Sequence, residues 1–183
     1  MYICLIQMDE ISKNMARIIL IFCIALTIIS CDQNKGISSI HQENWENRTI
    51  DFKLNDSLIL GNTYLSVYSQ IYSQSEHRTQ DLTVTVSMRN INLRDTVYVF
   101  KATYFDTHGK EIRSYLINPI FLAPMETAEI VIDEVDKEGG TGANFLFDWK
   151  VAKNANEPFF EAVMISTSGQ QGLSFTTNGK RIK

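Results

Sequence analysis

The amino-acid sequence predicts an all-β domain built as an antiparallel β-sandwich of about 7–9 strands. Short segments that alternate apolar and polar residues recur between residues 63 and 177, and turn-forming residues separate them. Strands that follow one another every ~8–12 residues are typical of sandwiches and barrels. Hydrophobic residues make up 44% of the 183 residues and charged residues 21%, as in a folded globular protein.

Two segments show the alternation most clearly. In residues 82–89 the apolar side chains belong to Leu82, Val84, Val86 and Met88. In residues 144–152 they belong to Phe145, Phe147, Trp149 and Val151. Because side chains on a strand point alternately to opposite faces, each segment predicts a strand with one buried face. Trp149 is therefore expected to anchor the core.

The other strands are predicted from composition and turn signals. A short first strand is expected at residues 49–54, and further strands at 96–105, 127–133, 159–166 and 173–177. Segment 96–105 is rich in aromatic and β-branched residues, and its mixed face pattern favours a central strand or a β-bulge. Residues 106–109, Asp-Thr-His-Gly, predict a hairpin turn in which Gly109 supplies the positive φ angle.

Residues 1–30 predict a lipoprotein signal peptide. Lys13 and Arg17 precede an apolar run from Ile18 to Ile29. This run is shorter than the ~20 apolar residues of a membrane-spanning helix, and it fits the ~7–15 residues of a secretory signal core. Ile28-Ile29-Ser30-Cys31 resembles the bacterial lipobox. We therefore expect cleavage between Ser30 and Cys31 and attachment of diacylglycerol to Cys31.

The expected signal divides the chain into three parts. Residues 1–30 form the signal peptide, and Met15 is an alternative start because acidic residues, unusual before a signal core, precede it. Residues 31–48 are polar and are expected to form a flexible tether. Residues 49–183 are expected to form the sandwich domain.

Two segments are similar to the sandwich modules of bacterial envelope proteins. The first is the strand at residues 81–90, and the second is Leu122-x-Pro124-x-x-Thr127-Ala128-Glu129-Ile130, a turn that leads into a strand. Together they resemble immunoglobulin-like domains, which implies that the predicted sandwich is immunoglobulin-like.

A longer set of motifs resembles one family. In chain order the motifs are Thr63-Tyr64-Leu65-Ser66-Val67-Tyr68-Ser69, Asp81-Leu82-Thr83-Val84-Thr85, Tyr104-Phe105-Asp106-x-x-Gly109-Lys110, Gly139-Gly140-Thr141-Gly142-Ala143-Asn144-Phe145, Glu161-Ala162-Val163-Met164-Ile165 and Gly172-Leu173-Ser174-Phe175-Thr176. Between about Gly61 and Lys183 they are similar to the bacterial domain-of-unknown-function family 3124. The resemblance implies an exported single-domain lipoprotein and supplies no activity.

Charge and motifs argue against several classes of function. The net charge is −4 and the basic residues are scattered, so no nucleic-acid partner is expected. The sequence has neither a Gly-x-Ser-x-Gly nucleophile motif nor a Gly-x-x-x-x-Gly-Lys-Ser/Thr phosphate loop. The three cysteines, Cys4, Cys23 and Cys31, leave the predicted domain without a thiol. We predict no catalytic residue, no cofactor and no metal.

One loop is the candidate site of contact with a partner. Its residues are Asp136, Glu138, Gly139, Gly140, Gly142 and Asn144. Acids at alternate positions before Gly139 are similar to the first half of an EF-hand loop, but the twelfth position, which needs a bidentate carboxylate, is Phe145. We therefore expect solvated acidic side chains there and at most a loose, millimolar-type calcium site.

The leading hypothesis is an envelope lipoprotein, anchored to a bacterial membrane through acylated Cys31 and facing the periplasm or the cell surface. Its sandwich would be a non-catalytic binding or scaffolding module that contacts other envelope proteins through strand edges or loops. The alternatives are a small-ligand or carbohydrate-binding module and a hydrolase-type enzyme. Carbohydrate binding would need three or more exposed, coplanar rings on one sheet, drawn from Tyr64, Tyr68, Tyr72, Tyr98 and Tyr115.

Overall fold

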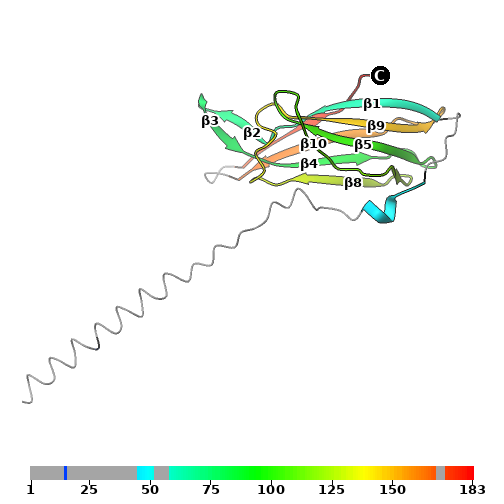
Figure 1. Cartoon of the computed structure of the whole chain (residues 1–183), viewed down its shortest axis with the longest axis horizontal. Coiled ribbons are helices and arrows are strands. Elements are labelled where there is room, and N and C mark those ends of the chain that lie inside the picture. Colours follow the sequence, from blue (N-terminus) through cyan, green and yellow to red (C-terminus); the bar gives the residue numbers. More distant parts are fainter. Residues whose placement is uncertain (1–14, 16–44, 52–57, 168–171) are drawn as a thin grey trace, which may run out of the picture. The chain divides into compact units, whose positions relative to one another are not determined.

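The computed structural model of the chain describes residue 15 and residues 45–51, 58–167 and 172–183. These residues contain twelve strands in three antiparallel sheets of six, four and two strands (Figure 1). Within them no helix has the length and apolar character needed to cross a membrane. Apart from Met15, the predicted signal peptide lies outside the described residues, as do its last residue Ser30, Cys31 and most of the predicted tether.

The larger sheet is centred on two long strands. Its order is β12 (Lys180–Arg181), β1 (Leu58–Ser66), β9 (Asn144–Ala152), β5 (Val97–Phe105) and β6 (Glu111–Ser114), and β7 (Ile120–Leu122) pairs with the start of β5. The pairing of β5 with β9 shifts register between Val99 and Lys101. The mixed pattern predicted for this segment therefore reflects both a central position and an irregularity of the β-bulge kind.

The second sheet carries β11 (Leu173–Asn178), β10 (Phe159–Ser166), β4 (Thr83–Arg89) and β8 (Thr127–Ile132) in that order. A separate hairpin, β2 (Gln70–Ser73) with β3 (Ser75–Asp81), lies at one end of the sandwich in Figure 1. The described residues exceed the expected 7–9 strands because β2 and β12 are too short to show an alternating pattern, and β3 is polar along its length with no apolar face.

The core lies between the two large sheets. Trp149 of β9 is fully buried, which confirms the predicted inward face of that strand. Its indole Nε1 donates a hydrogen bond to Thr63 Oγ1 at 2.9 Å. Gly61 on β1 makes room for the ring, since a Cβ atom there would lie 2.2 Å from it. Phe147 stacks on Phe160 of the opposite sheet with ring centroids 4.3 Å apart, so aromatic contacts join the two layers.

The structure differs from the sequence prediction just before the domain. Trp45–Arg48, expected in the tether, form a short 3-10 helix, η2, whose Trp45 packs against the core. Arg48 forms an ion pair with Glu126, the residue just before β8. The first strand expected at 49–54 is reduced among the described residues to one bridge between Thr49 and Ile120. Trp45 therefore belongs to the folded domain, because its ring packs against apolar residues of the core.

Candidate functional site

The candidate partner loop joins β8 to β9 at the same end as the β2–β3 hairpin. We call residues 133–143 the clamp loop, because they hold two hairpins together. Thr107, in the turn between β5 and β6, donates from its backbone N–H to Gly139 O at 3.1 Å and from its hydroxyl at 3.0 Å. The same hydroxyl accepts a bond from Gly142 N at 3.0 Å. On the other side, Gln70 N of β2 donates to Gly140 O at 3.1 Å.

The turn between β5 and β6 is the predicted hairpin turn. Asp106 Oδ1 accepts bonds from the backbone N–H groups of His108 and Lys110, each at 2.8 Å. The bond from Lys110, followed by that from His108, lowers the pKa of Asp106. Gly109 has a φ angle of 77°, which a residue with a side chain rarely adopts. This confirms the role predicted for Gly109.

Arg113 of β6 binds the acidic part of the clamp loop. Its guanidinium donates to Asp136 Oδ2 and to Glu138 Oε2, each at 2.7 Å. The Asp136 side chain is completely buried and that of Arg113 is 17% exposed. Burial disfavours the charged guanidinium, but these hydrogen bonds outweigh it and raise the pKa of Arg113. The prediction of solvated acids is therefore wrong for Asp136, which is buried because a cation reaches it.

Two tyrosines pack beneath this ion pair. The Arg113 guanidinium carbon lies 5.8 Å from the centroid of the Tyr104 ring, a cation–π distance. Burial raises the pKa of Tyr115 to about 12 and also raises the pKa of Tyr104. A Cβ atom at Gly139 would lie 1.9 Å from the Tyr104 hydroxyl oxygen, so this close approach requires glycine. The clamp loop thus packs on the rings of Tyr104 and Tyr115.

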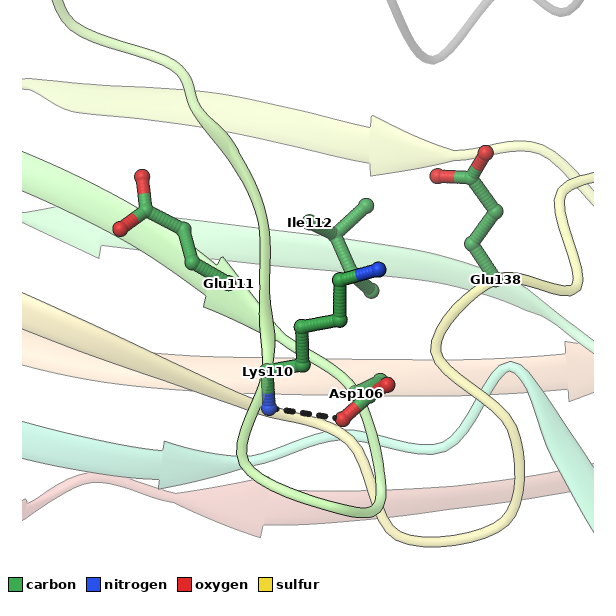
Figure 2. A pocket seen from close by; sticks show the side chains of 5 residues that line it. All are labelled: Asp106, Lys110, Glu111, Ile112 and Glu138. Atoms are coloured by element: carbon green, nitrogen blue, oxygen red, sulfur yellow. Dashed lines mark hydrogen bonds between the residues drawn. The ribbon is translucent and has the colours of Figure 1, made fainter.

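An open pocket of about 370 Å³ lies between the β5–β6 hairpin and the clamp loop. Its lining residues are Asp106, Lys110, Glu111, Ile112 and Glu138. Figure 2 shows Glu111 and Glu138 on opposite sides of Lys110 and Ile112. The pocket therefore offers one cation, carboxylates and a small apolar surface, a combination suited to a polar segment of another molecule.

The structure places the six predicted loop residues in different roles. Asp136 and Glu138 bind Arg113, and Glu138 also lines the pocket. Gly139, Gly140 and Gly142 contact Thr107 or Tyr104, while Asn144 begins β9 and pairs with Ser66 and Phe105. Sequence reasoning gave no role to Arg113, and it included Lys110 only in the family motif that begins at Tyr104. Neither residue forms a motif with the acids of the clamp loop, and the β5–β6 hairpin brings them to that loop.

The acids of the clamp loop are not arranged as ligands of one ion. Among the residues that the structure describes, no three His, Cys, Asp or Glu side chains form a group able to hold a metal. Asp136 and Glu138 instead point to the same arginine, and Phe145 is fully buried. The weak affinity for calcium stays a prediction.

The five candidate tyrosines do not share one exposed surface. Tyr64 on β1 and Tyr72 on β2 are exposed, but they belong to different sheets. Tyr68, Tyr98 and Tyr115 are half-buried. Tyr68 packs against Phe175 and Tyr115 against Phe145. The platform that would favour carbohydrate binding, three exposed rings on one sheet, is therefore not formed by these residues.

The chain was compared with known proteins. A search of curated proteins finds no match. One solved structure, described as "Crystal Structure of Thermotoga maritima 1070", is similar with a TM-score of 0.42 and 9% identity, over 66% of this chain and 92% of that chain. A family model described as "Protein of unknown function (DUF3124)" matches residues 61–182. Because this match covers most of the chain and nearly all of the sandwich, the chain belongs to the DUF3124 family.

Proposed function

We propose that this protein is an envelope lipoprotein whose sandwich presents the clamp loop and the β5–β6 hairpin as a non-catalytic binding surface for another envelope protein. The observation that carries the proposal is the Arg113–Asp136 ion pair, which holds an acidic loop rigidly beside an open pocket. A preformed surface loses little conformational entropy when a partner binds.

The chemistry of this surface supports recognition of a protein segment. Lys110 and Glu111 come from the hairpin, and Glu138 comes from the clamp loop, so complementary charges on a partner can meet both. Ile112 adds an apolar contact at the centre. Mixed polar and apolar contacts of this kind are typical of transient protein interfaces.

The position of the protein in the cell is inferred from the sequence. The apolar run from Ile18 to Ile29 followed by Ser30-Cys31 supports processing and acylation at Cys31. An acyl anchor would confine the sandwich to the membrane surface, where a weak contact becomes effective through high local concentration.

The binding surface is tested by site-specific photo-crosslinking in the native cells. A photoreactive amino acid replaces Lys110 beside the pocket, and in a matched control it replaces Lys153, an exposed lysine at the other end of the sandwich. We expect a discrete crosslinked protein from position 110 that is several-fold weaker or missing from position 153. Equal crosslinking at both positions would contradict the binding surface.

The anchor is tested separately with Cys31→Ala and metabolic labelling with a fatty acid. We expect the variant to accumulate as an unprocessed precursor without label, because the thiol is the attachment point. A variant that is cut at the same place and still carries acyl chains would refute the lipoprotein proposal. The crosslinking result at position 110 is read independently of this outcome.

A further inference from the structure

The end of the sandwich away from the clamp loop carries exposed apolar side chains on a rigid frame. Three loops meet there: residues 90–96 after β4, 123–126 before β8 and 153–158 after β9. Arg89 at the end of β4 pairs with Thr127 and Phe159, the first residues of β8 and β10, so these chain ends lie together.

Two buried asparagines hold the three loops in place. Asn90 Nδ2 donates to the backbone oxygens of Leu122 and Ala123 at 2.9 and 3.0 Å. Asn92 Nδ2 donates to Asn90 Oδ1 at 2.9 Å, and Asn92 Oδ1 accepts a bond from Asn156 N at 2.7 Å. Because both amides are buried and bonded on both sides, the loops have little freedom to rearrange.

This frame turns three apolar side chains toward solvent. Ile91, Leu93 and Met125, which we call the apolar tip, are 46%, 81% and 64% exposed. Their loops are joined by a bond from Met125 N to Asn92 O at 3.1 Å. Met125 also has a φ angle of 61°, a left-handed conformation that is costly for a residue with a side chain. Exposed apolar side chains held in this way are available for contact with another apolar surface.

The entry point of the chain indicates what covers the tip. Arg48 of η2 forms its ion pair with Glu126, the neighbour of Met125. Fourteen residue steps separate Cys31 from Trp45, the first residue of η2, so the two residues can be at most roughly 50 Å apart. Because the chain joins the sandwich beside Glu126, a lipid on Cys31 would be connected to the domain at the end that carries the apolar tip.

We propose that the apolar tip inserts into the headgroup boundary of the membrane that holds Cys31, so that the clamp loop faces away from the lipid. This inference rests on the proposed acyl anchor. Three side chains bury too little surface to bind a membrane alone, but the anchor makes their insertion an intramolecular event. The membrane would thus orient the domain and present the opposite end to a partner.

The test uses the full chain, produced in bacteria, purified from membranes in detergent and reconstituted into phosphatidylethanolamine–phosphatidylglycerol vesicles. An environment-sensitive fluorophore is attached through Leu93→Cys in the tip or through Val135→Cys in the clamp loop, which is also an exposed apolar position. Signal cleavage would remove Cys4 and Cys23 and acylation would block Cys31, so the introduced cysteine would be the only free thiol. The parent chain serves as the labelling blank. The emission wavelength of the fluorophore, and its quenching by brominated lipid, report how deeply the labelled position lies in the bilayer.

We expect a blue-shifted emission and several-fold stronger quenching at position 93 than at position 135. Equal, water-like emission at both positions in protein that floats with the vesicles would overturn the inference while leaving the anchor intact. Protection of position 93 in native membranes but not in pure lipid would also overturn it, in favour of a protein partner at the tip. Failure of the chain to float would overturn the anchor and the inference together.

Discussion

The two ends of the sandwich hold their loops by different chemistry. At the clamp-loop end the buried groups are charged, Arg113 with Asp136, whereas at the tip end they are the neutral amides of Asn90 and Asn92. A buried charge is stable only with its partner, while an amide costs less to leave unpaired. Loss of one partner should therefore cost most at the Arg113–Asp136 ion pair and less at each of the bonds that hold the tip.

The largest effect is expected from Arg113→Ala, which leaves the buried Asp136 carboxylate without its cation. We expect the free energy of unfolding, measured by denaturant titration, to fall by about 3–5 kcal/mol. Arg94→Ala, at an exposed arginine of the tip end, should change it by less than about 0.5 kcal/mol. A loss under about 1 kcal/mol for Arg113→Ala would show that water reaches Asp136.

A smaller effect is expected from Asn90→Ala, which removes the amide that binds Leu122 O and Ala123 O. We expect a loss of about 1–3 kcal/mol, because buried carbonyl oxygens lose a donor. Asn178→Ala on β11, where the asparagine is exposed, is the matched control. If the losses for Asn90→Ala and Arg113→Ala were equal, the contrast between neutral and charged ends would be refuted.

Alkaline pH should lower the free energy of unfolding through Tyr115, which packs beneath the clamp loop. The pKa of Tyr115 is raised by burial to about 12 from an ordinary value of 10, so the folded state keeps a proton that the unfolded state releases. The contribution of protonated Tyr115 to the free energy of unfolding is fully present below pH 10 and is lost as the pH rises through 12. The free energy then falls by at most about 1.4 kcal/mol per pH unit. Thermal unfolding of Tyr115→Phe should show a shallower decline between pH 10 and 12. If stability declined equally with pH in Tyr115→Phe and in the parent chain, Tyr115 would be excluded as the source of the decline.

The smallest effect concerns the strained residue of the apolar tip. Met125→Gly relieves a left-handed conformation that costs about 1–2 kcal/mol, and the greater freedom of glycine in the unfolded chain offsets about 0.5–1 kcal/mol of that gain. We expect unfolding stability to be unchanged or up to about 1 kcal/mol higher. Ala123→Gly in the same turn lacks this relief and should lower stability. A clear loss for Met125→Gly would mean that its side chain packs usefully at the tip.

The strands were predictable because their signal is local. The alternation at residues 82–89 and 144–152 predicted β4 and β9, and burial of Val84 and Phe147 confirms which faces point inward. A strand puts every second side chain on one face, so hydrophobic spacing alone determines which side is buried. The same logic identified Trp149 as a core residue. It did not detect β2 and β3, where the exposed residues of β3 show no apolar face.

The candidate site was predictable only in part. The sequence pointed to Asp136, Glu138 and the following glycines, because acids beside a glycine-rich segment stand out locally. It could not show that Arg113, 23 residues before Asp136, binds that carboxylate. Such a pair depends on how the β5–β6 hairpin meets the β8–β9 loop, and many carboxylates in the sequence were equivalent candidates.

By itself, then, the sequence determined the period-two strands and their buried faces, since both depend on residues close together in the chain. Only the tertiary structure decided which charges are buried and which loops share an end of the sandwich. Asp136 is buried and Glu134 exposed although they are two residues apart. Burial of a charge depends on a partner supplied from elsewhere in the fold, and local pattern does not encode that partner.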